Sequence, residues 1–168
     1  MTPTGVMIRP LRRDDRSSVE RILRQTKVFL EMEVQCALEL LDVYLNNAEQ
    51  KDYRLACAVD DADQPVGYVC YGPTPLTVGT YDLYWIAVDP AWHGGRVGSF
   101  LLEFVEQEIC RTASPHEGAR LLIIETSSLP RYQPAHRLYL RQHYCEVARI
   151  PDFYAEGDDR VIYAKRFR

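Results

Sequence analysis

The sequence predicts one α/β domain built on a mixed sheet. Short β-branched and aromatic runs alternate with amphipathic segments along the 168 residues, and no repeat, low-complexity tract or linker divides them. The apolar run at residues 119–126 has the length and composition of a strand buried on both faces. Residues 1–168 are therefore expected to form a single domain.

The first half is expected to hold a strand, two helices and a hairpin. Helical segments are recognised by apolar residues on one face, and the hairpin by two β-rich runs around a polar connection. In chain order these elements are a strand that lies within residues 6–12 and ends at Pro10, helices at 14–29 and 33–48, and hairpin strands at 53–60 and 66–72.

The second half is expected to alternate strands and helices and to end in a hairpin. Its elements are a strand at 80–89, a helix at 98–113, a strand at 119–126, a helix at 134–142, and paired strands at 144–150 and 159–167. The inward positions expected in the helix at 98–113 are Phe100, Leu101, Phe104, Val105 and Ile109.

Composition excludes several classes of protein. The 24 acidic and 20 basic residues give a net charge of −4, which argues against nucleic acid as the main partner. No apolar run reaches membrane-spanning length, and no signal peptide precedes the first strand, so we expect a cytoplasmic protein without a membrane partner. The five cysteines are odd in number and form no Cys-x-x-Cys pair, which indicates free buried thiols.

A metal site is not expected either. The four histidines show no metal-ligand spacing among themselves or with the cysteines. They are His93, His116, His136 and His143.

The stretch DPAWHGGRVGSF connects an expected strand to an expected helix. Helix N-termini expose unpaired N–H groups with partial positive charge, and glycines let an anion approach them. Gly98 is the best position for close approach, while Ser99 adds a hydroxyl and Arg96 a positive charge. The stretch predicts a phosphate-binding turn, with an ordinary glycine-containing turn as the alternative. It has neither the P-loop ending nor the dinucleotide-binding spacing.

Two segments of the chain resemble motifs of the GNAT superfamily, the GCN5-related N-acetyltransferases. WIAVDPAWHGGRVGSFLLEFVE resembles the family's motif A, and AHRLYLRQHY resembles its Ala-x-x-Leu-Tyr-x-x-x-Gly-Phe segment. The resemblance implies a mixed, mostly antiparallel sheet whose two central strands splay apart. The positions of motif A that match are Ala87, Val88, Asp89, Pro90, Gly94, Val97, Gly98, Leu101 and Leu102.

Three positions depart from the family's pattern. His93 stands where the family usually has Gln or Arg, and Arg96 and His143 stand where it usually has Gly. A non-glycine residue held at positive φ costs about 1 kcal/mol, so we expect strain at Arg96 and His143. Arg96 is also expected to alter the affinity for the cofactor.

The resemblance implies acetyl-CoA as the acyl donor. Its pyrophosphate would lie on backbone N–H groups of the turn, and its pantetheine arm would pair with the first splayed strand like an added strand. The residues that would bind it are Ile86, Ala87, Val88, His93, Gly94, Gly95, Arg96, Val97, Gly98 and Ser99.

The resemblance also implies candidates for acid and base. Tyr139 matches the motif tyrosine that protonates the departing thiolate; packing on the inner face of its helix is the alternative. Asp82 is the candidate base, acting through a water, although it could simply face solvent. Glu125 is its rival, with Tyr84 and Glu31 as weaker choices. An amide near Ile86 would stabilise the oxyanion.

The acceptor is not identified by the sequence. A primary amine of a small molecule, an amino acid or a peptide fits the resemblance, and a homodimer is compatible with it. A Pro- and Ser-rich loop at residues 125–135 could close over the site, where Ser127 and Ser128 would bind substrate or cap the turn. Aromatic residues available for the acceptor pocket are Tyr71, Tyr81, Tyr84, Trp85, Phe153 and Tyr154.

Two other functions compete with acetyl transfer. A CoA-binding regulatory domain without turnover would explain the residues that replace glycine at Arg96 and His143. A nucleotide-dependent enzyme would use the turn for ATP phosphates, but the chain lacks Walker and Mg²⁺-ligand patterns.

Overall fold

The computed structural model describes residues 3–112 and 118–167. The chain forms two compact units: the first comprises Met1–Gly72 and Trp85–Val105, and the second comprises Pro73–Tyr84 and Glu106–Arg168. His116 and the predicted end of the third helix at residue 113 lie outside the described residues.

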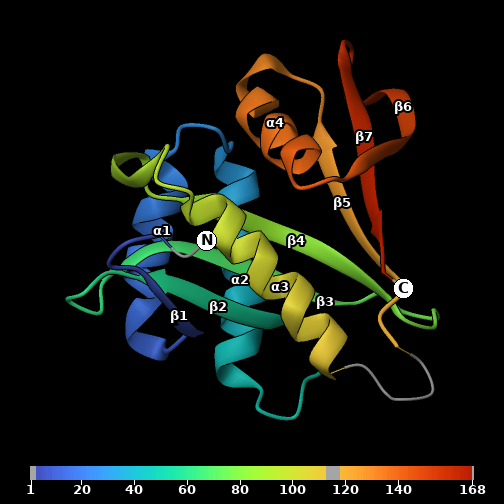
Figure 1. The fold of residues 1–168 in the computed structure, drawn as a ribbon. Helices are drawn as coiled ribbons and strands as arrows, with labels where there is room; N and C mark the ends of the chain where they lie inside the picture. Colours follow the sequence, from blue (N-terminus) through green and yellow to red (C-terminus); the bar gives the residue numbers. More distant parts are fainter. Residues whose placement is uncertain (1–2, 113–117, 168) are drawn as a thin grey trace. The chain divides into compact units, whose positions relative to one another are not determined.

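Seven strands form a mixed sheet, as predicted (Figure 1). Their order is β1-β2-β3-β4-β5-β7-β6. β4 and β5 run parallel, whereas β1–β2, β2–β3, β5–β7 and β6–β7 are antiparallel. The strands are β1 Met7–Pro10, β2 Arg54–Val59, β3 Pro65–Pro73, β4 Thr80–Val88, β5 Leu121–Ser127, β6 Cys145–Ala155 and β7 Asp158–Arg166.

In the first unit, α1 (Arg16–Gln25) and α2 (Glu31–Asn46) cover one face of β2 and β3. Cys57 lies opposite Tyr68 in the β2–β3 register, so both side chains share that face. Burial raises the pKa of Tyr68, and neighbouring thiols, including Cys36 on α2, raise it further.

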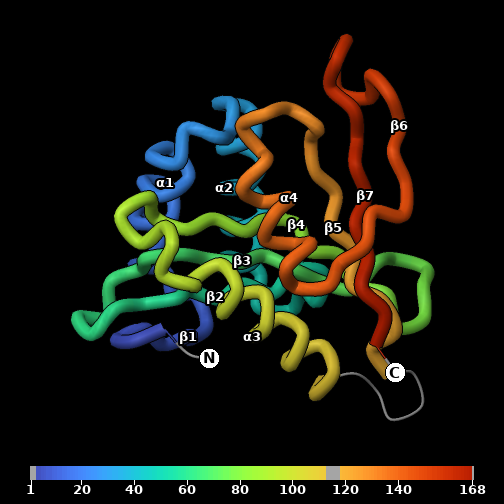
Figure 2. The backbone as a smooth tube through the Cα atoms, turned by 45° about the horizontal axis from the view of Figure 1, so that its top comes forward, coloured from blue at the N-terminus to red at the C-terminus, as the bar shows by residue number. Residues whose placement is uncertain are grey.

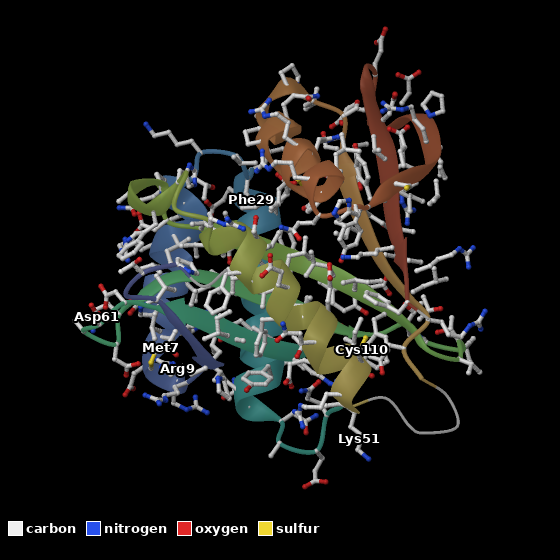
Figure 3. The ribbon with its side chains drawn as sticks, in the orientation of Figure 1. Met7, Arg9, Phe29, Lys51, Asp61 and Cys110 are labelled. Carbon is white, nitrogen blue, oxygen red and sulfur yellow. The ribbon has the colours of Figure 1, made fainter. Side chains whose placement is uncertain are left out.

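The end of α1 differs from the prediction. The helix stops at Gln25, because Thr26 turns its hydroxyl back to the carbonyl of Leu23 at 2.8 Å and Lys27 adopts a φ of 54°. Phe29 therefore lies outside the helix. Its ring packs edge-on against Trp85 of β4, with ring centroids 5.5 Å apart (Figure 3).

The opposite face of β3 receives the start of α3 (Val97–Thr112) at a glycine. A Cβ on Gly67 would lie 3.1 Å from both the carbonyl oxygen of Ala87 and a methyl group of Leu101, and 3.3 Å from a methyl group of Val97. Only glycine permits this approach without displacement. The prediction that Phe100 and Phe104 face inward is wrong, because both are only half-buried. The fully buried stripe of α3 is Leu101, Leu102, Val105 and Ile109.

A charged cluster ties β1 to the start of the first helical segment. Arg9, labelled in Figure 3, donates to Asp15 at 2.7 and 2.9 Å and to Asp63 at 2.6 Å. Asp15 is almost fully buried and also accepts from the amide of Arg12 at 2.7 Å. Burial raises the pKa of Asp15, but these hydrogen bonds outweigh it and hold the pKa below its usual range.

In the second unit, β5 buries one face more than the other. Leu122, Ile124 and Thr126 are buried, whereas Ile123 is half-buried and Glu125 exposed. The prediction of a strand buried on both faces is therefore wrong. α4 (Gln133–Arg141) packs on the buried face, and β6 and β7 run side by side as a long hairpin (Figure 2).

The cysteines are free, but the prediction that they are buried holds for only two of them. Cys57 and Cys70 are buried, and burial raises the pKa of the Cys57 thiol to about 12. Cys36, Cys110 and Cys145 are exposed.

Candidate active site

The turn after β4 is fixed by Asp89. Its amide donates to the carbonyl of Val66 at 2.8 Å, and its carboxylate accepts from the amide of Ala91 at 2.9 Å and from Arg21 at 2.8 Å. Burial raises the pKa of Asp89, but the bonds from Arg21 and Ala91 outweigh this and lower it overall. These contacts hold the chain where it leaves the strand, before the short 3-10 helix Pro90–Trp92.

Two residues with left-handed backbone conformation then shape the turn. Gly94 has a φ of 81° and Arg96 a φ of 64°, which confirms the predicted strained conformation at Arg96. The amide of Gly95 donates to the carbonyl of Trp92 at 3.2 Å. Nothing lies within 4 Å of a Cβ built on Gly94, so this part of the turn is open to a ligand.

Four amides at the start of α3 have no acceptor among the described residues. The first intrahelical hydrogen bond runs from the amide of Phe100 to the carbonyl of Arg96, at 2.9 Å. Within residues 3–112 and 118–167, no acceptor is found for the amides that precede it, as is usual at helix N-termini. They belong to Arg96, Val97, Gly98 and Ser99. Such a group can hold an anion without any side-chain charge.

The side chains around these amides differ in exposure. Val97 is buried and anchors the helix, whereas His93, Gly94, Gly95 and Arg96 are exposed. The ring Nε2 of His93 lies 3.0 Å from the carbonyl oxygen of Val88, a contact that requires the proton on Nε2. His93 therefore folds back onto the end of β4.

The last residues of β4 alternate in burial. Ala87 is buried, while Ile86 and Val88 are half-buried. Trp85, one of the candidate acceptor aromatics, is half-buried against Phe29.

In the second unit, Tyr139 sits in a tyrosine cluster. Its ring is buried, with centroids 5.6 Å from that of Tyr163 and 6.3 Å from that of Tyr144. Burial raises the pKa of Tyr139 well above its usual value, and Tyr163 raises it further. The phenol therefore stays protonated near neutral pH and keeps a proton that it can donate.

Buried His136 fixes α4 to β5 and β7. Its Nε2 lies 2.8 Å from the carbonyl oxygen of Ser127, so Nε2 carries the proton and Nδ1 accepts from the hydroxyl of Tyr163 at 2.8 Å. This histidine positions the helix that carries Tyr139. From the sequence, His136 was noted only as one of four histidines without metal-ligand spacing. Its helical spacing of three residues from Tyr139 is the one signal of this role.

Asp82 and Glu125 share the other face of this part of the sheet. Asp82 lies opposite Ile123 in the parallel register, which places it on the face that carries Glu125 two residues further along β5. Asp82 is half-buried and accepts from the hydroxyl of Thr74 at 2.6 Å. Glu125 is ion-paired with Arg160 of β7. The sequence pattern gave no indication of Arg160.

Burial is the main cause that raises the pKa of Asp82. The hydrogen bond from Thr74 lowers it, the charge of Glu125 raises it and the charge of Arg160 lowers it, with a net shift upward. A raised pKa makes Asp82 a better proton acceptor than an ordinary surface aspartate. The buried tyrosine and this carboxylate lie on opposite faces of the β4–β5 pair.

The register between β4 and β5 is short. It joins Thr80–Leu83 to Leu121–Ile124, so the next residues of the second unit, Tyr84 and Glu125, already lie outside it. This is the behaviour expected of two central strands that diverge.

Other candidates from the sequence have structural roles. The hydroxyl of Ser127 donates to Asp158 at 2.5 Å, and that of Ser128 accepts from the amide of Asp159 at 2.8 Å, so both serines tie β5 to the β7 hairpin. Glu31 is exposed and ion-paired with Arg24. Among the candidate aromatics, Tyr71 and Tyr81 are buried, whereas Phe153 and Tyr154 are each 48% exposed.

Comparison with known proteins identifies the family. The profile of the "Acetyltransferase (GNAT) domain" matches residues 51–146. A protein from Desulfovibrio desulfuricans assigned to the GNAT family of acetyltransferases has 38% identity and a TM-score of 0.88, with 96% of this chain and 98% of that chain covered. The chain belongs to the GNAT superfamily and is a GNAT N-acetyltransferase, a class of enzyme that uses acetyl-CoA.

More distant structures share the fold. The ribosomal-protein-S18-alanine N-acetyltransferase of Escherichia coli has a TM-score of 0.72 at 16% identity, with 96% of this chain and 93% of that chain covered. Arabidopsis thaliana NAA60 in complex with acetyl-CoA has a TM-score of 0.74 at 16% identity, with coverage of 96% and 98%. A comparison with curated proteins gives no match.

Two further observations concern the described part of the chain. No group of three or more His, Cys, Asp or Glu side chains there could hold a metal ion. None of its helices is both long and apolar enough to cross a membrane.

Proposed function

We propose that residues 1–168 act as a single N-acetyltransferase domain that moves the acetyl group of acetyl-CoA to a primary amine by direct attack. The acceptor is a small molecule, an amino acid or a peptide. The observation that carries this proposal is the row of amides at the start of α3 that have no acceptor in the described part of the chain, next to the open left-handed turn. It supports a site for a diphosphate.

Acetyl-CoA binding is assigned to the first unit. Within residues 94–98, the amides other than that of Gly95, which already donates to Trp92, hold the pyrophosphate. The hydroxyl of Ser99 lies next to them in the chain, and the guanidinium of Arg96 adds a positive charge. Backbone groups of residues 86–88 pair with the pantetheine arm. His93 competes with the pantetheine arm for the carbonyl of Val88, because its ring is hydrogen-bonded to that carbonyl. An amide near Ile86 stabilises the oxyanion.

Asp82 acts as the base, through a water, from the face of the β4–β5 pair opposite to Tyr139, and the reaction takes place where the two strands diverge and both faces are within reach. The acceptor ammonium has a pKa near 10 and must lose a proton before its nitrogen attacks the thioester carbon. The raised pKa of Asp82 supports this role, while the ion pair of Glu125 with Arg160 leaves Glu125 less free to take a proton. Tyr84 and Glu31 are not assigned a chemical role.

Tyr139 acts as the acid. When the carbon–sulfur bond breaks, the thiolate leaves and takes the proton of the phenol. The raised pKa keeps the hydroxyl protonated until the sulfur leaves, so its proton is available for a hydrogen bond to the departing thiolate and for transfer to it. Tyr139 returns to its protonated form by exchange with solvent after the products leave.

Two measurements test the proposal. Thiol release from acetyl-CoA in the presence of a panel of amines reports transfer, and thermal unfolding reports binding. We expect acetyl-CoA, but not ATP, to raise Tm, and at least one amine to accelerate thiol release. Protection by acetyl-CoA without release by any amine would instead favour a CoA-binding regulatory domain.

A further inference from the structure

Three charged side chains from three neighbouring strands meet on one face of the second unit. Asp82 comes from β4, Glu125 from β5 and Arg160 from β7. The registers place them on the same face, since Asp82 lies opposite Ile123 and Glu125 lies opposite Ile162. The order of charges across the strands is therefore negative, negative, positive.

The guanidinium of Arg160 is held in place from two sides. It is ion-paired with Glu125, and its central carbon lies 4.8 Å from the ring centroid of Phe153. Its side chain is only 25% exposed. A guanidinium with both a carboxylate and an aromatic ring against it has a defined plane and little freedom to move.

A large bulge in β6 brings Phe153 to this position. Between the pairs Ile150–Arg160 and Ala155–Asp158, four residues of β6 stand against one residue of β7. Asp152 stabilises the bulge, since its amide donates to Asp159 at 3.1 Å and its carboxylate accepts from the amide of Gly157 at 2.7 Å. Bulges of this kind commonly re-aim a side chain next to a site.

Arg160 retains unused hydrogen-bonding capacity. Its Nε–H is buried and has no acceptor in the described part of the chain, and the ion pair with Glu125 is the single hydrogen bond found there for its guanidinium. A buried donor without an acceptor costs free energy and calls for an unseen partner such as a water or a ligand. Because the donor is cationic, an anionic oxygen is the best partner.

We propose that the acceptor is an amine that also carries a carboxylate a few bonds away, as in a free amino acid, and that Arg160 binds this carboxylate. The inference rests on the proposed acetyl transfer and narrows its acceptor. An ammonium beside Asp82 and Glu125 and a carboxylate beside Arg160 complement the charges of the three strands. Glu125 contacts Arg160 directly, so a short zwitterion can place its ammonium beside Glu125 and its carboxylate beside Arg160. Asp82 stands one strand further away, across β5 from β7. A diamine would leave the Nε–H of Arg160 without an acceptor.

The test compares amines that differ only in the carboxylate. L-phenylalanine is paired with 2-phenylethylamine, and L-leucine with 3-methylbutylamine, extended over the common amino acids and their decarboxylated counterparts. Binding to the CoA-saturated protein is measured by calorimetry, and thiol release from acetyl-CoA is measured in parallel. We expect at least one amino acid to bind roughly 10- to 100-fold more tightly than its decarboxylated partner.

Variants assign the preference to Arg160. Arg160→Met should bring the ratio of affinities close to one, and Arg160→Lys should restore only part of it, because lysine lacks the planar fork. Arg149→Met is the matched control: Arg149 is a hairpin arginine opposite Val161, on the other face, paired with Glu146 and Asp159. It should leave the ratio unchanged. All variants should keep the rise in Tm caused by acetyl-CoA.

Each outcome has a defined meaning. Equal binding of amino acids and their decarboxylated partners, no binding of any amino acid, or a preference that survives Arg160→Met would overturn the assignment. A preference for the carboxylate that Arg160→Met removes supports it, even if no amine releases thiol. In that case the proposed acetyl transfer fails while recognition of the carboxylate by Arg160 stands.

Discussion

Asp82 and Glu125 project from neighbouring parallel strands onto one face of the sheet, yet only Glu125 is ion-paired with Arg160. Asp82 instead accepts a single hydrogen bond of 2.6 Å from Thr74. The two carboxylates are thus close in space and different in environment. Environments that separate two carboxylates in this way usually assign them different roles.

The pH dependence of the rate should identify the base. The rate should rise with pH as Asp82 loses its proton, over a range above that of an ordinary aspartate because burial raises its pKa. In Asp82→Asn we expect this rise to flatten and kcat to fall about 10²- to 10⁴-fold. The profile of kcat/KM between pH 4 and 9 is the measurement. Glu125→Gln is the control and should keep the rise; if it alone abolishes the rise, Glu125 is the base.

Asp82→Asn should also be more stable than the parent protein at neutral pH. Since the folded-state pKa of Asp82 is raised, the protonated form favours folding below the unfolded pKa of about 4, and this contribution is lost as pH rises through the folded pKa. Asparagine removes the buried charge and can still accept from Thr74. We expect Tm to increase by about 1–4 °C at pH 7, with no difference below pH 4. An unchanged Tm at pH 7 would mean that the charge is well solvated.

Tyr139→Phe should separate chemistry from binding. The substitution removes one hydroxyl and keeps the ring that packs on Tyr144 and Tyr163. We expect kcat to fall about 10²-fold or more while the dissociation constant of acetyl-CoA stays within about twofold. Stopped-flow thiol release and calorimetry measure the two quantities. Equal turnover in the variant would assign Tyr139 to packing alone.

Arg96→Gly should relieve backbone strain and change cofactor affinity. Arg96 and His143 have φ values of 64° and 66°, which cost each residue about 1 kcal/mol. Glycine at either position should stabilise the fold by up to about 1 kcal/mol, less the extra entropy that it gives the unfolded chain. His143→Gly is the matched control, since it follows α4 and not the anion-binding turn. Only Arg96→Gly should change the dissociation constant of acetyl-CoA; equal constants in both variants and the parent would remove Arg96 from the phosphate site.

Asp15 should govern part of the acid sensitivity of the fold. Its pKa is lowered in the folded state, so its contribution is fully present above the unfolded pKa of about 4 and is lost as pH falls through the folded pKa. We expect Asp15→Asn to lose about 2 kcal/mol of unfolding free energy at pH 7, because Arg9 keeps a largely buried charge with one partner fewer. Urea unfolding at several pH values measures this. A deficit that stays constant down to pH 2 would contradict the assignment.

Local sequence patterns predicted most of the fold. Apolar periodicity located the strands and α-helices of the described chain, but not its 3-10 helices, and β6 extends to Ala155, beyond the predicted end at residue 150. Arg96 and His143, which replace glycine, were expected to be strained and have positive φ. The early end of α1 was missed, because Thr26 and Lys27 terminate the helix without glycine or proline. The assumption that an apolar run is buried on both faces failed for β5, where the face that carries Glu125 is partly exposed.

Long-range pairing limited the prediction of the site. Arg160 meets Glu125 only because of the β5–β7 register, and it meets Phe153 only because of the bulge in β6. Neither feature has a signature in adjacent residues. The structural role of His136 could not be predicted, because its hydrogen-bond partners Ser127 and Tyr163 are nine and 27 residues away in the chain.

The close approach of α3 to β3 at Gly67 links two properties that are usually engineered separately. A methyl group introduced there would push the helix outward at its first turn, where Val97 and Leu101 make the contact. A substitution at Gly67, about 30 residues before the turn, would then both loosen the core and weaken diphosphate binding. Directed evolution for thermal stability should consequently retain Gly67, even though this residue does not contact a ligand.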